Sequence, residues 1–556
     1  MDQDLVCTRR SLLAFPATLA GQAPSPELDP AVVRRHESAV EELLRRQVTD
    51  PASPWYGGFP DPFGLHHAGS AAGALEMFTA AFLHPSSKFR GSAELLERMR
   101  LAAAFLERSQ NPQGNIDLLI TNFNSPPDTA FCVHSVARAA LLARRAGEAR
   151  LAGLTDRFLR RAMAALVLGG VHTPNHRWVV CQALAQLWEL YREPGCLRRI
   201  DQWLAEGIDI DADGQYTERS TLIYNAVTNR ALITVAAKLG RDELLDPVRR
   251  NLGAMLYLLH ADGELVTEIS RRQDQYQRGD ASPHWFSLQY MAMRDRDGRF
   301  AALARRLFAR NASLGAIMEY PELLGPLPPD AALPQAFERE FPGLGIARIR
   351  RGPVSATIFL RGSSRLLHWR RGEVVVEAVR LASAFFGKGQ FVPQQGFKRG
   401  DSYVLSQSLE GDYLQPLDPP RRVGPQDWSA TRALRRRSQT CRLEHAATIT
   451  ETARGFRLHI RVSGTQRVPA AVEINLRAGG KLEGVAPAPQ VDDGWLFAAD
   501  TVRYRAGDEA VVFGPGLRQH AYTQIRMAEP KLPGPSVYLT GYSPLDHTLE
   551  FRWEKA

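Results

Sequence analysis

The chain has 556 residues, of which 44% are hydrophobic and 23% charged, a composition that indicates a globular protein and excludes a disordered or fibrous one. Because one hydrophobic core rarely extends over so many residues, we expect at least two domains. The formal net charge is +9, and only seven of the 69 basic residues are lysines. The arginine excess has two explanations: a genomic bias, or an acidic partner whose oxygens pair with guanidinium groups.

The N-terminus resembles a bacterial twin-arginine export signal. Arg9 and Arg10 precede a short apolar run through Ala20, which small residues follow. We therefore expect residues 1–23 to direct export and the mature protein to be periplasmic or secreted. The apolar run is too short to span a bilayer, and no other stretch reaches that length, so we expect no membrane partner.

Residues 24–318 carry apolar residues at helical spacing. Two such stripes are Ala130, Val133, Ala137 and Leu141, and Val227, Ala231, Val235 and Leu239. Glycine-containing turns separate the helices, and two of these turns are near copies with the sequence Ala-Asp-Gly, at 212–214 and 261–263. Their spacing fits one helical hairpin per repeat. We predict an α/α toroid, complete or incomplete; a plain superhelical solenoid is the alternative.

A second domain of different class is expected after residue 342. Residues 319–342 contain six prolines and are predicted to form a linker. In residues 343–556 the period of hydrophobicity changes to two, and the strand-like stretches are 346–350, 356–360, 373–377, 456–462 and 471–476. Many short strands without intervening helices predict an antiparallel β-sandwich.

The five cysteines show neither a disulfide framework nor the spacing of a metal-binding finger. They are Cys7, Cys132, Cys181, Cys196 and Cys441. We expect mostly free, buried thiols.

Candidate functional residues lie on the loops between the helices, which a toroid gathers at one mouth. The first patch contains Asn122, Asn124 and Asp128 around an aromatic residue, as a sugar subsite would; Asp128 or Ser125 could equally cap a helix. The second patch combines Asn175, His176, Arg177 and Trp178 at a predicted helix start, where an asparagine is often only a cap.

Two further patches follow the copied turns. The third contains Glu218, Arg219 and Tyr224, and if its helix begins near Ser220 the tyrosine points back toward the loop mouth. A core tyrosine is the alternative. The fourth runs from Glu268 through Arg271, Arg272 and Asp274, with His284 soon after; a solvated charged loop is the alternative.

The order and spacing of these residues resemble those of polysaccharide lyases. Asp213-Gly214-Gln215-Tyr216 and Ile269-Ser270-Arg271 resemble motifs of the chondroitin/hyaluronate lyases. Glu218, Ser220 and Tyr224 resemble the Glu-x-Ser-x-x-Tyr motif of the heparinase II/III-like lyases, with one additional residue before the tyrosine. Arg219 stands where the hyaluronate lyases carry a histidine, and we expect His176 to substitute for it.

The resemblance implies cleavage of a uronic-acid-containing polysaccharide by β-elimination. Asn175 with Arg271 or Arg272 would neutralise the uronate carboxylate, His176 or Tyr224 would take the C5 proton, and Tyr224 would protonate the leaving oxygen. The catalytic candidates are thus Asn175, His176, Tyr224 and Arg271. The substrate-binding candidates are Asn122, Asn124, Asp128, Trp178, Glu218, Arg219, Arg272, His284 and, from the sandwich, Lys388, with His368 a looser candidate.

The mechanism requires no metal or organic cofactor, although the sequence is compatible with a structural ion. Two other functions remain open. A glycoside hydrolase would use two carboxylates from Asp128, Asp213, Glu218 and Asp274, and a non-catalytic protein would bind carbohydrate on the repeats. Nucleic acid is not expected as a partner, because the arginines are dispersed and no nucleic-acid-binding module is evident. The sequence does not select the polysaccharide, the mode of attack, the stereochemistry or the oligomeric state.

Overall fold

The computed structural model describes residues 28–555, so the predicted export signal lies outside the described residues. The chain forms two compact units. The first contains the residues up to Val171 together with Gln182–Ile200 and Leu288–Asp330. The second contains His172–Cys181, Asp201–Ser287 and the chain from Ala331 onward.

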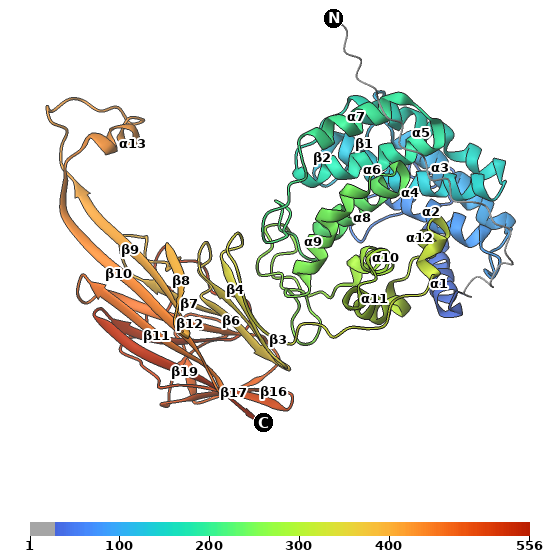
Figure 1. Cartoon of the computed structure of the whole chain (residues 1–556). Helices are drawn as coiled ribbons and strands as arrows, with labels where there is room; N and C mark the ends of the chain where they lie inside the picture. The colour runs from blue at the N-terminus through green and yellow to red at the C-terminus, as the bar shows by residue number, and fades with distance from the viewer. Residues whose placement is uncertain (1–27, 556) are drawn as a thin grey trace, which may run out of the picture. The chain divides into compact units, whose positions relative to one another are not determined.

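The first unit is helical. Helix α2 packs against α3 and α4, and α4 packs against α5. Ser125 caps α4 by accepting the Asp128 N–H, and the predicted stripe beginning at Ala130 is buried along this helix. The elements are α1 (Pro30–Arg46), α2 (Ala68–Leu83), α3 (Ala93–Ser109), the hairpin β1 (Ile116–Leu118) and β2 (Asn122–Ser125), α4 (Pro126–Arg145), α5 (Ala149–Leu168), α11 (Gly298–Asn311) and α12 (Leu314–Glu319) (Figure 1). Three further helices each belong to both units: α6 (Pro174–Tyr191), α7 (Pro194–Ala205) and α10 (Trp285–Asp295).

A five-residue turn recurs between helices in both units, at residues 61–65, 111–115, 211–215 and 260–264. In each turn the first residue's N–H donates to the fifth residue's carbonyl, and the fourth residue is a glycine with positive φ. Only glycine adopts that conformation without strain. The two turns that the sequence identifies as copies therefore belong to a longer structural repeat.

The helices of the second unit support two long loops. Helix α8 (Tyr224–Leu239) packs against α9 (Leu245–Met255), and its Ala231 and Val235 are buried as predicted. The helix begins at Tyr224, four residues later than the expected start at Ser220. The Ser220 hydroxyl oxygen accepts the Tyr224 N–H at 2.9 Å. A side-chain hydrogen bond thus spans residues 220–224, where the sequence predicted the first turn of the helix.

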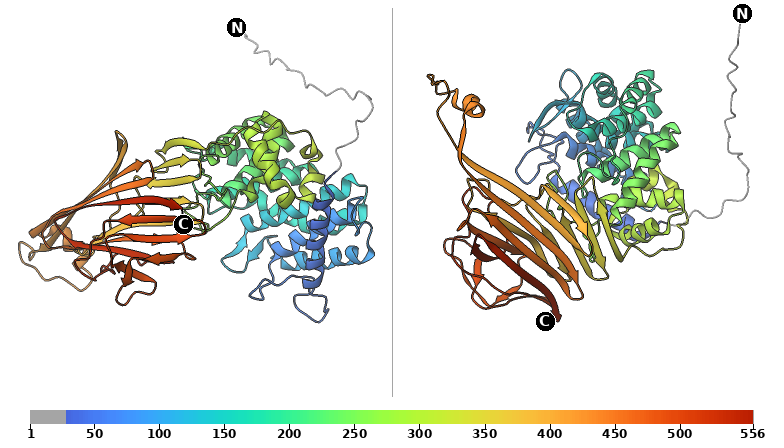
Figure 2. Two further views of the ribbon diagram at one scale, coloured as in Figure 1. Left: turned by 90° about the horizontal axis from the view of Figure 1, so that it is seen from below. Right: turned by 60° about the vertical axis from the view of Figure 1, so that its left-hand side comes forward.

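The β-rich part of the second unit is a sandwich of two sheets, in which all strand pairs but β15 with β18 are antiparallel (Figure 2). One sheet has the order β14-β15-β18-β12-β7-β6-β5-β4-β3 and the other β13-β16-β17-β19-β11-β10-β9-β8. The strands are β3 (Ala336–Phe341), β4 (Ile346–Arg351), β5 (Val354–Phe359), β6 (Leu367–Arg371), β7 (Val374–Ser383), β8 (Gln395–Arg399), β9 (Ser402–Leu414), β10 (Arg437–Thr452), β11 (Gly455–Gly464), β12 (Pro469–Leu476), β13 (Lys481–Glu483), β14 (Val485–Pro487), β15 (Gly494–Phe497), β16 (Val502–Ala506), β17 (Glu509–Gly514), β18 (Ser536–Tyr542) and β19 (Leu545–Lys555).

Both sheets contribute to one hydrophobic core. Trp369 on β6 lies in its centre, fully buried and in contact with the rings of Phe456, Phe551 and Trp553 from the opposite sheet. All five strand-like stretches of the sequence coincide with strands. Between β9 and β10 the chain leaves the sandwich as an extended arm that carries the short helix α13 (Trp428–Thr431) (Figure 1).

The cysteines agree with the expectation for the described residues. Cys132, Cys181 and Cys196 are buried, Cys441 is half-buried, and none of these four forms a disulfide. Within residues 28–555, no helix is long and apolar enough to cross a membrane.

Candidate functional site

The third and fourth sequence patches meet at one buried carboxylate, that of Asp274. Its Oδ1 accepts the Ser220 hydroxyl at 2.9 Å, while its Oδ2 accepts the Ser270 hydroxyl and the Leu222 N–H, each at 3.0 Å. Asp274 is fully buried, so these bonds form in a medium of low dielectric and are strong. This carboxylate therefore fixes the two loops of the second unit to each other.

Tyr224 lies at the centre of the contacts between these loops. Its hydroxyl oxygen accepts a hydrogen bond from Gln273 Nε2 at 2.7 Å, and the Arg272 guanidinium lies 5.0 Å from its ring centroid. The side chain is half-buried, so its hydroxyl lies near the protein surface. The guanidinium and the ring form a cation–π contact.

Glu218 connects this tyrosine environment to the second patch. Its Oε2 lies 3.4 Å from Arg272 Nε, and its Oε1 accepts the backbone N–H of Asn175 at 3.3 Å. The Asn175 Oδ1 accepts the Thr173 hydroxyl, whereas its buried Nδ2 has no hydrogen-bond partner within the described residues. The structure thus brings Asn175, Glu218, Arg272 and Tyr224 together, and the buried amide donor of Asn175 lacks a partner within the described residues.

His176 and Trp178 lie on the same helix as Asn175 but are more enclosed. The His176 ring is buried and packs edge-on against His172, with centroids 4.7 Å apart. Trp178 is fully buried, and its Nε1 donates to Asp209 Oδ1 at 2.9 Å. Trp178 therefore contributes to packing in this conformation, since no face of the indole is open to a sugar ring.

A pocket of about 440 Å³ adjoins the fourth patch and is rich in arginine. Three arginines, Arg219, Arg271 and Arg361, line it together with two glutamates, Glu268 and Glu529. Burial and the neighbouring Arg271 charge lower the pKa of the Arg219 guanidinium, although the Asp211 and Asp213 carboxylates act in the opposite direction. Such a cluster attracts an anion that would neutralise it.

Several predicted residues are not joined to this cluster. Asn122, Asn124 and Asp128 belong to the first unit, where Asn122 Nδ2 donates to Asp128 Oδ2 at 2.9 Å. Lys388 follows β7 and donates to the Glu410 carbonyl. His284 is buried beneath the third patch, where its Nε2 bonds to the Thr221 carbonyl at 2.8 Å.

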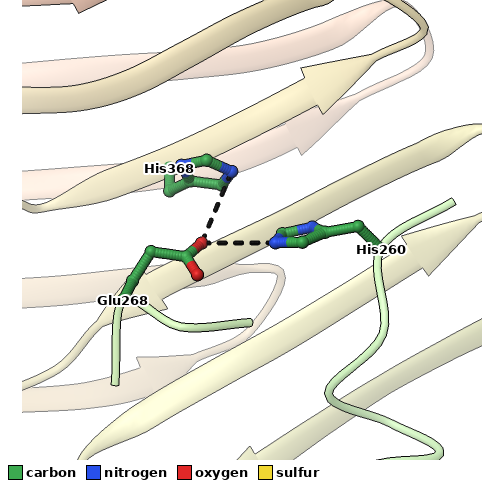
Figure 3. A group of neighbouring side chains, drawn as sticks. All are labelled: His260, Glu268 and His368. Carbon is green, nitrogen blue, oxygen red and sulfur yellow. Dashed lines mark ion pairs between the residues drawn. The ribbon is translucent and has the colours of Figure 1, made fainter. Parts of the chain in front are cut away.

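A second cluster, of His260, Glu268 and His368, was not identified from the sequence as a unit. The Nε2 atoms of both histidines lie 3.4 Å from the same oxygen, Oε1 of Glu268, and all three side chains are buried (Figure 3). His260 and Glu268 come from the loop after α9, and His368 comes from β6. Their separation by about 100 residues in the chain hid the cluster from local motif analysis. The donor atoms lie within 4.8 Å of one another and could hold a metal ion.

Comparisons with solved structures place this fold among polysaccharide lyases. The chain is 15% identical to a chondroitin AC lyase of Streptomyces coelicolor A3, with a TM-score of 0.56, over 96% of this chain and 81% of that one. It is 9% identical to the heparan sulfate lyase HepC of Pedobacter heparinus, with a TM-score of 0.51 over 96% and 86%. A Paenibacillus xanthan lyase is 11% identical, with a TM-score of 0.54 over 95% of this chain and 56% of that one.

No protein-family model matches the sequence, and no curated protein matches it either. The predicted resemblance to polysaccharide lyases and the predicted fold class, an α/α toroid followed by an antiparallel β-sandwich, are confirmed by the structural comparisons. At 9–15% identity these similarities show the fold alone.

Proposed function

We propose that the protein is a polysaccharide lyase that cleaves a uronic-acid-containing polysaccharide by β-elimination. The observation that carries the proposal is the continuous set of contacts from Asn175 through Glu218 and Arg272 to Tyr224, on a fold that known polysaccharide lyases share. These residues supply an amide, a fixed cation and a phenol, which are the groups that elimination requires.

The first requirement is neutralisation of the substrate carboxylate. The C5 proton of a uronate becomes acidic only when the negative charge of the adjacent carboxylate is offset as the enolate-like intermediate develops. The Nδ2 group of Asn175 has no partner within the described chain and can donate to that carboxylate. Arg271 lies on the wall of the arginine pocket and supplies the compensating positive charge.

The second requirement is transfer of the proton from C5 to the leaving oxygen. We assign both steps to Tyr224, because its hydroxyl lies near the surface and accepts a hydrogen bond from Gln273 of the neighbouring loop. The Arg272 guanidinium, 5.0 Å from the ring centroid, places a positive charge beside the phenol that takes the C5 proton in its ionised form. The same hydroxyl then donates that proton to the glycosidic oxygen as the bond to C4 breaks.

The carboxylates argue against hydrolysis by a pair of acids. Glu218 is engaged by Arg272 and the Asn175 backbone, Asp274 accepts three hydrogen bonds, and Asp213 accepts the Leu344 N–H at 2.9 Å. Hydrolysis needs one carboxyl group to protonate the leaving oxygen and a second on the other side of the bond. These three are committed to holding loops in place, which favours the lyase over the hydrolase.

The substrate we propose is an acidic polysaccharide or oligosaccharide, and we propose export to the periplasm or beyond, as the sequence of residues 1–23 indicates. The arginine pocket fits an anionic chain, because its three arginines, Arg219, Arg271 and Arg361, outnumber its two glutamates. Asn122 and Asn124 remain proposed as an additional sugar-binding patch of the first unit.

The experiment is an elimination assay on a panel of acidic polysaccharides, read by the ultraviolet absorbance of the unsaturated uronate product. We expect Tyr224→Phe to lose about 10²–10⁴-fold in kcat, the usual contribution of a proton-transfer group, with little change in substrate binding. Tyr257→Phe is the matched control, since this half-buried tyrosine packs on Phe337 in the same unit. New reducing ends without the absorbance would show hydrolysis and refute the proposal.

A further inference from the structure

The cluster of His260, Glu268 and His368 presents three electron-pair donors to one point. Both Nε2 atoms face Oε1 of Glu268 at 3.4 Å, which exceeds the ordinary length of an N–H···O hydrogen bond (Figure 3). Within the described residues, neither His368 Nε2 nor Glu268 Oε1 has a hydrogen-bond partner. Buried polar atoms without partners cost free energy, so their convergence calls for an occupant.

The tautomer of His368 indicates that the occupant accepts an electron pair, as a metal ion does. Its Nδ1 lies 3.3 Å from the Glu377 backbone carbonyl, which can only accept a hydrogen bond. Nδ1 therefore carries the proton, and in the neutral ring Nε2 offers a lone pair toward the carboxylate. The corresponding neighbour of His260 Nδ1 is the Ser355 hydroxyl at 2.9 Å, which can accept in the same way. An outer hydrogen bond that exposes Nε2 is the usual support of a metal-binding histidine.

Two buried arginines, Arg348 and Arg370, lie near the cluster. Nearby Arg370 is paired with Asp262 at 2.8 Å and Glu264 at 2.7 Å, and Arg348 donates to Ser355 and Thr357. Because the two arginines have their own acceptors, the Glu268 carboxylate remains directed at the histidines.

The distances agree with tetrahedral coordination. A zinc ion with bonds of about 2.0–2.2 Å to nitrogen and oxygen separates its ligand atoms by about 3.4 Å. Both nitrogen-to-oxygen separations have this value, and the three donor atoms lie within 4.8 Å of one another. A small inward movement of the two rings would complete the geometry.

The helical repeat supplies an independent sign that His260 is specialised. In the turns at 61–65, 111–115 and 211–215, the first residue is Asp or Asn, and its side chain accepts the N–H of the fifth residue at 2.9–3.0 Å. His260 holds that place in the fourth turn, and the N–H of Glu264 bonds to Asp262 there. His260 has thus left the role that its position has elsewhere in the repeat and faces Glu268.

We propose that His260 Nε2, a carboxylate oxygen of Glu268 and His368 Nε2 bind one Zn²⁺, with a water molecule as the fourth ligand. Two imidazoles and one carboxylate in a tetrahedral arrangement form a typical zinc donor set. The ion ties the loop after α9 to strand β6, and this loop continues into Arg271, Arg272 and Gln273. It would therefore hold in place the loop that contacts Tyr224.

The test measures the metal content of the purified full chain after dialysis against metal-free buffer. We expect roughly one Zn²⁺ per chain, a Tm that falls by several degrees with a chelator and recovers with Zn²⁺, and strong visible bands of tetrahedral Co²⁺ after substitution. These readouts need no substrate, so they succeed or fail independently of the proposed lyase activity.

Glu268→Gln and His368→Asn should lose the ion, and His445→Asn should retain it. His445 is an equally buried sandwich histidine bonded to Ser383 and Gln407, outside the cluster. Wild-type protein that holds no metal and shows neither a chelator effect on Tm nor tetrahedral Co²⁺ bands overturns the proposal, whether or not the variants fold. Equal metal content in the cluster variants and the control also overturns it.

Discussion

The loops that begin with the turns at 211–215 and 260–264 occupy equivalent places in the helical repeat, yet they are held by different means. The first is closed by Asp211, whose Oδ1 accepts the Gln215 N–H at 2.9 Å. The second begins with His260, which faces Glu268 and strand β6. A repeated backbone thus supports two separate tasks, one loop presenting Tyr224 and the other combining cationic side chains with a candidate metal site.

Asp274 joins the two loops, so its replacement tests whether they act as one structure. Asp274→Asn would leave an amide N–H₂ facing the Leu222 N–H and the Ser270 hydroxyl, which both need acceptors. We expect a loss of about 3 kcal/mol in the free energy of unfolding, measured by urea denaturation, because bonds to a buried charge are involved. The exposed Asp508→Asn is the control. An unchanged stability would mean that the loops are fixed independently.

The first loop contacts His284, and this contact predicts that the stability of the protein depends on pH. The Nε2–H of His284 donates to the Thr221 carbonyl, Nδ1 has no partner in the described chain, and burial lowers the pKa of the ring from 6.5 to about 4. Below pH 6.5 His284 takes up a proton in the unfolded chain but remains neutral in the folded chain. The free energy of unfolding therefore declines as the pH falls toward 4.

His284→Gln separates this effect from general acid denaturation. A glutamine amide can still donate to the Thr221 carbonyl but does not titrate, so the variant should lose less stability than wild type over the same interval. The difference is at most about 3 kcal/mol, since each pKa unit is worth about 1.4 kcal/mol. Parallel pH profiles of the two proteins, obtained from urea denaturation, would show that His284 does not control the support of the first loop.

The sequence predicted the two parts of the fold because periodicity is a local property. The sequence placed the start of the sandwich at residue 343, whereas β3 already begins at Ala336, within the predicted linker, because its pairing with β4 is a longer-range contact. The stripe of α4 is buried as expected, and so are Ala231 and Val235 of the α8 stripe. The start of α8 was placed too early, because Asp274, 54 residues beyond Ser220, holds the preceding segment out of the helix. A contact of that range leaves no trace in local spacing.

The candidate site was predictable to a similar extent. Tyr224, Arg272, Glu218 and Asn175 were identified from motifs and do come together. Gln273 was missed because a glutamine in a charged loop has no distinguishing pattern, although its Nε2 contacts the Tyr224 hydroxyl. His368 was proposed for the substrate cleft, whereas the fold directs it toward Glu268, a pairing that depends on how β6 meets the loop after α9.

Replacing Asn175 tests whether catalysis depends on the first loop, because the Asn175 backbone N–H donates to Glu218 of that loop. Asn175→Ala removes the amide that we propose for the substrate carboxylate. We expect kcat to fall by about 10–100-fold with a smaller change in KM, because this contact strengthens as charge develops. Thr173→Ala, which removes the hydroxyl donor to Asn175 Oδ1, should cost less. A change confined to KM would assign Asn175 to binding alone.

The smallest expected effect concerns the turn at 211–215. Asp211→Ala removes the side-chain acceptor of the Gln215 N–H and should cost about 1 kcal/mol in the free energy of unfolding, equally with and without Zn²⁺. Asp211→Asn should be nearly neutral, since Asn111 closes the equivalent turn through its own Oδ1. If Asp211→Ala is also neutral, the acceptor is dispensable in this turn, and a histidine at position 260 would then be an ordinary variation and no sign of a metal site. If only the asparagine restores stability, the repeat does require an acceptor at this place, and His260 has given up that role in favour of its contact with Glu268.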